Sequence, residues 1–269
     1  MNGERNVAAG DHGEPARPEG GSRVIVERTM DSEWLSNAYL IGDGDGGAAI
    51  AIDSGAPLDP HFKTLENRRL RLQAILTTHR HFDHAGGNGE LHRQTGAPIF
   101  ALEAEVPHVE GAEPLVGGET RSWGSLNVKV IPLPGHTAGQ AGYLVEGVGL
   151  FTGDCLFAGS LGGTVGPAST GFEDTRRAVL GGILSLPDDT VIYPGHCEST
   201  TVGGERTGNP FIRVMTGIDP EGTGRCMAMG RPARVIVNAR DYDGGSKVWV
   251  RFDDGGDALV PGSRVRIPG

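Results

Sequence analysis

A short run of metal-binding side chains, Thr78-His79-Arg80-His81-Phe82-Asp83-His84, constrains this chain more than any other feature. Four potential ligands occupy six consecutive positions, in the order His-x-His-x-Asp-His, and they include three of the nine histidines of the chain. The apolar residues 74–76 come just before this run, as in a buried strand that ends in a loop. Imidazole and carboxylate groups suit zinc and iron, and functional loops commonly follow strands. The pattern predicts a metal site at a strand end.

Three further residues of metal-binding type follow apolar residues elsewhere in the chain. Each comes directly after a glycine: His136 in Leu-Pro-Gly-His, Asp154 in Phe-Thr-Gly-Asp and His196 in Tyr-Pro-Gly-His. Glycine lets the backbone approach a site closely. Any one of these alone is better explained as a turn residue. Together with the first run they make five histidines and two aspartates, which is enough for two ions.

The hydrophobic periodicity predicts helices and strands in a mixed order, which implies a layered α/β domain. Helical spacing covers residues 60–72, 88–94 and 172–186, and strands are expected at residues 24–26, 38–41, 48–52, 74–77, 98–101, 126–133, 142–145, 149–152 and 191–193. Further strands at residues 233–237, 247–252 and 258–260, with Asp-Gly turns between them, predict a compact β unit, such as a small barrel. We therefore expect a disordered tail over residues 1–22, a catalytic domain over residues 23–220 and a small C-terminal β domain over residues 221–269.

Composition narrows the class of protein further. The net charge of −10 disfavours binding to a phosphate backbone. Three widely spaced cysteines without a Cys-x-x-Cys pair favour a reducing interior over a disulfide framework. No apolar stretch approaches the roughly 18 residues of a membrane span, and residues 1–21 lack the apolar centre of a secretory signal. We expect a cytoplasmic protein without nucleic-acid or membrane partners, and the sequence does not indicate its oligomeric state.

In sequence order, these motifs resemble those of the metallo-β-lactamase superfamily, in particular of its glyoxalase II-like hydrolases. The resemblance covers about residues 24–212 and implies an αββα sandwich, with two mixed sheets face to face, helices outside and metals at one edge. It also implies the ligands: His79, His81 and His136 for a first ion, Asp83, His84 and His196 for a second, and Asp154 as a bridge between them. The implied cofactors are two divalent ions, zinc first, with iron and manganese as alternatives.

The resemblance implies hydrolysis of a thioester or a small acyl ester. Two neighbouring cations lower the pKa of a shared water, so that hydroxide is available near neutral pH to attack the acyl carbonyl. A metal would also take up the charge that develops on oxygen and stabilise the leaving thiolate or alkoxide. Asp83 and Asp154 are the expected catalytic residues, and Asp83 would orient the nucleophile as well as bind metal. Cys155 and Cys197 adjoin proposed ligands and are expected to pack beside them.

The chain departs from glyoxalase II after the bridging aspartate. That enzyme carries a Lys and a Tyr there that help to hold glutathione, and residues 156–167 of this chain contain neither. Many bacterial relatives carry Gly-Arg-Thr-Asp where this chain has Gly-Gly-Thr-Val at residues 162–165, and the lactonase branch carries a Tyr where this chain has Phe157. The C-terminal β unit also replaces the helical domain of glyoxalase II. These departures weaken the predictions of glutathione recognition and of lactonase activity.

The main alternative is a mononuclear iron oxidoreductase of the persulfide dioxygenase type. It would use only His79, His136 and Asp154, a set of two histidines and one carboxylate. The acidic charge disfavours nucleic-acid processing, and the full ligand set disfavours a non-catalytic binding module. Serine hydrolysis is disfavoured because the chain has no Gly-x-Ser-x-Gly motif. β-Lactam hydrolysis is disfavoured because no export signal is recognised.

Overall fold

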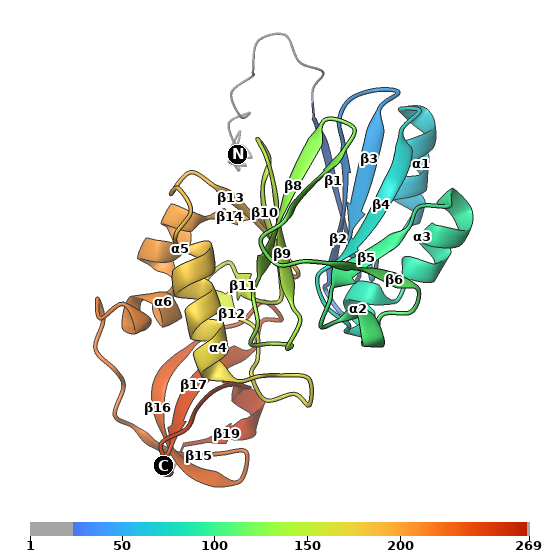
Figure 1. Cartoon of the computed structure of the whole chain (residues 1–269). Helices are drawn as coiled ribbons and strands as arrows, with labels where there is room; N and C mark the ends of the chain where they lie inside the picture. Colours follow the sequence, from blue (N-terminus) through green and yellow to red (C-terminus); the bar gives the residue numbers. More distant parts are fainter. Residues whose placement is uncertain (1–23, 268–269) are drawn as a thin grey trace, which may run out of the picture.

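The computed structural model describes residues 24–267 and contains two six-stranded sheets that pack face to face (Figure 1). The first sheet has the order β1 (Ile25–Met30), β2 (Asn37–Gly42), β3 (Ala48–Ile52), β4 (Arg71–Thr77), β5 (Ile99–Leu102) and β6 (Ala112–Leu115). The second has the order β14 (Thr200–Thr201), β13 (Val191–Pro194), β10 (Gly149–Gly153), β9 (Ala141–Val145), β8 (Leu126–Pro132) and β7 (Thr120–Trp123). Both sheets are mixed, because β3 to β6 are parallel, β10 and β13 are parallel, and the other neighbours are antiparallel.

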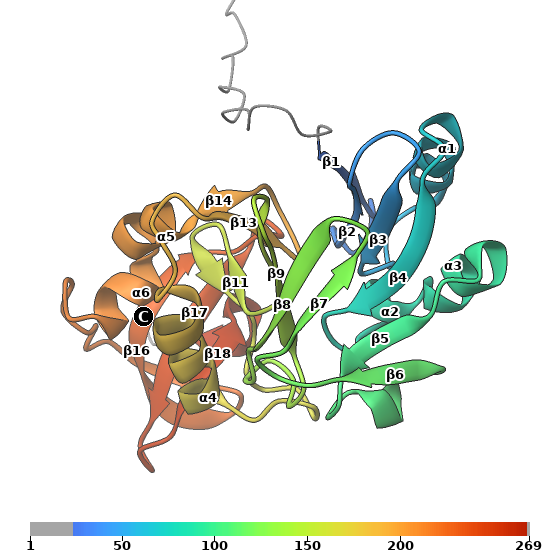
Figure 2. The ribbon, with the colours of Figure 1, turned by 45° about the horizontal axis from the view of Figure 1, so that its top comes forward.

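Helices cover the outer face of each sheet (Figures 1 and 2). The helices α1 (Asp59–Asn67), α2 (Phe82–Ala85) and α3 (Asn88–Thr95) belong to the first half, together with the short 3-10 turn η1 (Val106–His108). The second half carries α4 (Phe172–Arg177), the π-helical turn η2 (Ala178–Ile183), α5 (Val202–Gly208) and α6 (Pro210–Met215). This four-layer αββα arrangement confirms the predicted fold class.

Two apolar clusters explain why the layers hold together. The inner faces of both sheets meet in one cluster, where Ile50, Leu76 and Tyr39 pack with Val128, Val130 and Phe151. On the outer face of the first sheet, Leu65 of α1 and Leu91 of α3 pack against Leu40 and Ile75. Burial of apolar surface of this extent is the main stabilising contribution to such a fold. The strands therefore end at fixed positions, and their end loops lie together at one edge.

A third sheet follows the sandwich, with the order β18 (Asp257–Pro261), β17 (Ser246–Phe252), β16 (Arg231–Arg240), β15 (Arg225–Ala228) and β19 (Val265–Arg266), and a 3-10 turn η3 (Gly262–Arg264). One face forms its own cluster around Val248, Val250 and Val260. The other face places Trp249 and Leu259 in the cluster that also contains Phe172 of α4. The sheet lies below α4 and α6 in Figure 1, so the C-terminal unit shares a core with the second half of the sandwich.

Most predicted elements form, with differences that have local causes. The helix predicted over residues 60–72 ends at Asn67, and β4 begins at Arg71. Arg69 has a positive φ of 54°, which stops the helix and lets Leu70 turn into the core. The strands β6 and β7 were not predicted from the sequence; they are short and mostly exposed or half-buried, so their apolar pattern is weak.

Two domain-level predictions remain predictions. The expected disordered tail over residues 1–22 lies outside the described residues. The expected domain boundary near residue 220 stays a prediction, because the C-terminal sheet and the sandwich share one apolar cluster. Within residues 24–267 no helix has both the length and the apolar character that crossing a membrane requires.

Candidate metal centre

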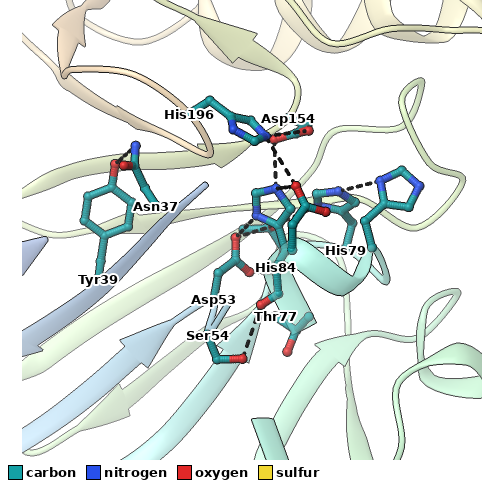
Figure 3. Close-up of polar contacts among 12 residues, drawn as sticks. Asn37, Tyr39, Asp53, Ser54, Thr77, His79, His84, Asp154 and His196 are labelled. Atoms are coloured by element: carbon teal, nitrogen blue, oxygen red, sulfur yellow. Dashed lines mark hydrogen bonds and ion pairs between the residues drawn. The ribbon is translucent and has the colours of Figure 1, made fainter. Parts of the chain in front are cut away.

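The seven predicted ligands lie together at one edge of the sandwich, on loops that follow strands. The first four come from the loop after β4 and from α2, which begins directly behind His81. The others follow β8, β10 and β13, so both sheets contribute. Figure 3 shows His196 and Asp154 facing His84 and His79 across this edge. The tertiary structure therefore brings residues from four separate segments into one place.

Three histidines form one group of potential ligand atoms, made of His79, His81 and His136. Nδ1 of His81 lies 3.0 Å from Nε2 of His79 and 2.9 Å from Nε2 of His136. Nitrogen lone pairs that converge at this spacing repel one another unless a proton or a cation lies between them. A single cation can use all three at once, as tetrahedral zinc sites do.

Asp83, His84 and His196 form a second group of potential ligand atoms. Oδ2 of Asp83 lies 3.5 Å from Nε2 of His84 and 3.6 Å from Nε2 of His196. The side chain of Asp83 is 18% exposed, whereas both histidines are buried. Within this group, the carboxylate is thus the member that solvent or a substrate can reach.

Asp154 lies between the two groups. Its Oδ2 is 3.5 Å from Nε2 of His136 in the first group and 3.4 Å from Nε2 of His196 in the second. Its Oδ1 lies 3.2 Å from Nε2 of His84. One carboxylate therefore reaches ligand atoms on both sides, which is the position that a bridging ligand requires.

Two buried polar atoms indicate that the donor set suits cations. Nε2 of His84 and Oδ1 of Asp154 are buried and lie 3.2 Å apart, but among the described residues neither forms a well-aligned hydrogen bond with the other or with any other group. A buried polar atom without a partner costs free energy. Divalent ions would satisfy both atoms, and the mixture of imidazole and carboxylate groups suits zinc, iron or manganese. The residues present therefore fit a pair of divalent metal ions.

Burial and charge set the pKa of these groups in ways that favour ligation. Burial lowers the pKa of His79 and of His136, which keeps both imidazoles neutral and able to donate a lone pair. Burial also opposes the charged form of Asp154, but His196 and His84 together hold the pKa of this carboxyl well below its usual value. The carboxylate that lies between the two groups is thus ionised.

Asp53 supports both groups of ligands and was missed from the sequence. It follows β3, and its Oδ2 accepts a hydrogen bond from Nδ1 of His84 at 2.9 Å (Figure 3). The same oxygen accepts a hydrogen bond from Oγ1 of Thr78 at 2.8 Å. The Thr78 hydroxyl in turn lies 3.0 Å from Nδ1 of His79. A carboxylate behind a ligand histidine fixes its tautomer and orientation. The signal was present, because Asp53 also comes directly after a fully buried strand.

Glu105 is a second supporting carboxylate that was missed. It is fully buried and accepts hydrogen bonds from Nε of Arg80 at 2.6 Å, from Oγ1 of Thr137 at 2.8 Å and from the backbone N–H of Gly139 at 3.0 Å. Arg80 stands between two ligands of the first loop, and Thr137 follows His136. Glu105 therefore ties the first ligand loop to the loop that carries His136.

Within residues 24–267, neither Cys155 nor Cys197 belongs to a group of potential ligands. Cys155 is buried in the apolar cluster beneath Asp154. Cys197 is half-buried, with a φ of 62°. Both cysteines are next to proposed ligands in the sequence, and neither contributes an atom to the groups of potential ligands described above.

Residues 31–196 match the family model of the metallo-beta-lactamase superfamily, and the chain belongs to this superfamily. Within it, the chain is 31% identical over 208 residues to the hydroxyacylglutathione hydrolase GloC of Haemophilus influenzae, covering 70% of this chain and 97% of that protein. It is 41% identical over 182 residues to the hydroxyacylglutathione hydrolase of Brucella ovis, covering 66% of this chain and 64% of that enzyme, so the chain spans less than two thirds of that relative. These relatives support a dinuclear metallohydrolase of the glyoxalase II type.

Solved structures agree with this assignment. The structure of ETHE1 from Myxococcus xanthus is similar with a TM-score of 0.62 and 28% identity, covering 72% of this chain and 91% of that one. The structure of TTHA1623 in a di-iron-bound form is similar with a TM-score of 0.58 and 30% identity, covering 68% of this chain and 98% of that one. The family model and the curated relatives confirm the glyoxalase II-like resemblance of the motifs, at the level of the superfamily and of the hydrolase branch.

Proposed function

We propose that this protein hydrolyses a small thioester at a centre of two divalent ions, zinc first, with the seven predicted ligands in the roles assigned above. The observation that carries the proposal is the position of Asp154, whose Oδ2 lies 3.5 Å from a ligand nitrogen of one group and 3.4 Å from one of the other. A carboxylate placed between two groups of ligand atoms is suited to bridge two ions, one held by each group. Hydroxyacylglutathione is the substrate class that the names of the relatives suggest.

The metal pair would supply an activated water at neutral pH and a positive charge for the acyl oxygen. The chain's own residues supply position and proton handling. Asp83 is the more exposed of the two ligand carboxylates, at 18% against 9% for Asp154, so its free oxygen can accept a proton from the attacking water and orient it. Asp154 is held ionised by its histidine neighbours and keeps the two ligand groups at a fixed separation.

The chain lacks, after Asp154, the residues that hold the glutathione leaving group in glyoxalase II. Residues 156–167 offer no Lys and no Tyr. Arg80 is next to the ligands, but Glu105 accepts hydrogen bonds from both its Nε and its Nη2, at 2.6 and 3.2 Å. Its charge is therefore already compensated. We propose that recognition rests on the acyl carbonyl and the thioester sulfur more than on the carboxylates of a peptide-like thiol.

Metal content tests the function first. We expect close to two ions per chain, zinc or mixed zinc and iron, by elemental mass spectrometry of protein purified without added metal or chelator. Such protein should hydrolyse S-D-lactoylglutathione or a simpler thioester, and Asp154→Ala should lose both one ion and the activity. A single ion, with no second taken up on reconstitution, would overturn the dinuclear mechanism.

A mononuclear iron oxidoreductase that uses His79, His136 and Asp154 is the second candidate. The similarity to the ETHE1 structure is the observation that favours it. In that case one iron per chain and oxygen consumption with glutathione persulfide are expected, without thioester hydrolysis.

A further inference from the structure

The C-terminal sheet reaches His196 through the turn that joins two of its strands. This turn, residues 241–245, joins β16 to β17 and carries Tyr242. The phenol ring of Tyr242 stacks on the imidazole of His196, with ring centroids 4.1 Å apart and planes 13° apart. Phe157 contacts both rings edge-on, at 5.0 Å from Tyr242 and 5.5 Å from His196. One face of a proposed metal ligand is thus covered by a residue from outside the part of the chain that matches the family model.

His196 differs from other ligands in how its ring is held. Nδ1 of His84 is bonded to Asp53, and Nδ1 of His136 lies 2.8 Å from the carbonyl oxygen of Gly163. Nδ1 of His196 is buried and has no hydrogen-bond partner among the described residues. Ligand histidines usually depend on such a bond to fix their ring orientation. For His196 this means of control is missing, and flat contact with an aromatic ring takes its place.

The turn that carries Tyr242 is firmly anchored to the sandwich. Oδ1 of Asp241 accepts a hydrogen bond from Oγ of Ser160 at 2.8 Å, and its Oδ2 lies 3.1 Å from Nζ of Lys247. Asp241, Lys247 and Ser160 are all buried. Ser160 belongs to the hairpin of β11 (Leu156–Phe157) and β12 (Ser160–Leu161), which follows Asp154 directly. The position of Tyr242 is therefore fixed relative to the bridging carboxylate.

A second contact of the same unit supports His136. The backbone N–H of Thr164 donates to the carbonyl oxygen of Leu259 in β18 at 3.0 Å, and the N–H of Leu259 donates to Oγ1 of Thr164 at 2.8 Å. Thr164 follows Gly163, whose carbonyl oxygen faces Nδ1 of His136. The C-terminal unit thus contacts His196 of the second group directly, and it contacts His136 of the first group indirectly, through Thr164 and Gly163.

We propose that Tyr242 is a positioning residue of the metal centre, and that the C-terminal unit completes this centre by stacking Tyr242 on His196. The inference rests on the proposed function, because it takes His196 to be a ligand of the second ion. Stacking restricts rotation of the imidazole and excludes water from one face, so Nε2 stays directed at the site. The requirement is for an aromatic ring and not for the hydroxyl group.

The test compares Tyr242→Ala with Tyr242→Phe, using zinc binding as the readout besides thioesterase activity. Zinc affinity is measured by competition with a chelating dye, and zinc content by elemental mass spectrometry after dialysis. We expect Tyr242→Ala to retain the first ion and to bind the second about 10- to 100-fold more weakly. Tyr242→Phe should bind both ions like the unaltered protein, because it keeps the ring.

Trp123→Ala is the matched control. Trp123 is half-buried and packs on Phe100 at 5.7 Å between ring centroids, in strand β7. Its loss reports the general effect of removing an aromatic contact, and we expect it to leave zinc binding unchanged. Circular dichroism of each variant checks that it folds.

The other outcomes each overturn a stated claim. If Tyr242→Ala binds both ions with unchanged affinity, the positioning role is wrong. If both Tyr242 variants keep two ions and lose kcat, the hydroxyl acts on substrate and stacking is not the reason for the residue. If the unaltered protein itself takes up only one ion, the proposed dinuclear function is wrong, and this inference is wrong with it. That result is seen without any substitution, so it can be told apart from a failure of the positioning role alone.

Discussion

Oδ2 of Asp53 and Nδ1 of His84 lie 2.9 Å apart, although the two residues are separated by 31 positions in the sequence. This bond to Nδ1 leaves Nε2 of His84 free to face the site. The same carboxylate also accepts a hydrogen bond from the hydroxyl of Thr78, which in turn lies next to Nδ1 of His79. Asp53 has a positive φ of 57°, a conformation that the surrounding hydrogen bonds maintain. A single residue outside the ligand set thus supports a histidine of each ligand group.

We predict that Asp53→Asn weakens metal binding. Asparagine has nearly the same volume, but it has one acceptor oxygen where the carboxylate has two. Its NH2 group must therefore face either the backbone N–H of Thr78, which now donates to Oδ1, or the His84 and Thr78 side chains, which now donate to Oδ2. Loss of such a supporting carboxylate costs about 10- to 100-fold in metal affinity. Competition titration with a zinc chelator measures this. Asp45→Asn, which alters an exposed carboxylate, is the control, and equal affinities of the two variants would contradict the supporting role.

Gly195→Ala should damage the centre from the backbone side. A Cβ at this position would lie 2.3 Å from Oδ1 of Asp154 and 2.8 Å from Cε1 of His84, so both side chains would have to move. We expect loss of bound metal and a fall of about 100-fold in activity. At Gly208, at the end of α5, a Cβ would meet nothing within 4 Å, so Gly208→Ala should leave both unchanged. Full metal content in Gly195→Ala would show that the site tolerates the displacement.

Glu105→Gln should reduce stability as well as activity. The change leaves Arg80, whose side chain is 19% exposed, without its charged partner. Removing one member of a buried ion pair typically costs about 3–5 kcal/mol, and the partial exposure of Arg80 places this case near the lower end. Urea unfolding gives the value. Glu103→Gln, at an exposed position two residues away, should stay within about 0.5 kcal/mol. A similar small effect for Glu105→Gln would mean that the pair is not needed.

We predict that the buried side chain of His61 makes the folded protein less stable in acid. It is fully buried in α1, and burial lowers its pKa to about 4. In the unfolded chain a histidine has a pKa of about 6.5, so between these values the unfolded state binds the extra proton. Its contribution to stability is therefore constant above about pH 6.5 and is lost progressively as the pH falls towards 4, by about 3 kcal/mol in total.

The variant His61→Leu should remove this component. Unfolding free energies measured between pH 7 and pH 4 should fall less steeply in this variant than in the unaltered protein. His108→Leu, which alters an exposed histidine, should keep the original pH dependence. If the two variants and the unaltered protein share one slope, His61 does not titrate across this range.

Local sequence was sufficient for the ligand candidates and for most of the fold. Residues 79–84 lie in one loop, and each of the other three ligand candidates follows a strand and a glycine, so short-range patterns are enough to single them out. The order of strands and helices indicated the layers, because the period of apolar residues is set by the geometry of each element. Where the pattern failed, at the end of α1, a single left-handed residue decided the outcome, and no periodicity announces such a residue.

The sequence by itself determined which chemical groups are available and at which strand ends they stand. Only the tertiary structure decided that Asp53, Glu105 and Tyr242 belong with them, from positions 31, 25 and 46 residues away from the partners that they hold. Their roles depend on hydrogen bonds and ring contacts that act over a few ångströms. Such distances are created when both sheets and the C-terminal unit bury their apolar faces together. The place of Asp53 at a strand end was a local signal for that residue, but no local property of Glu105 or Tyr242 indicates the partner that it contacts.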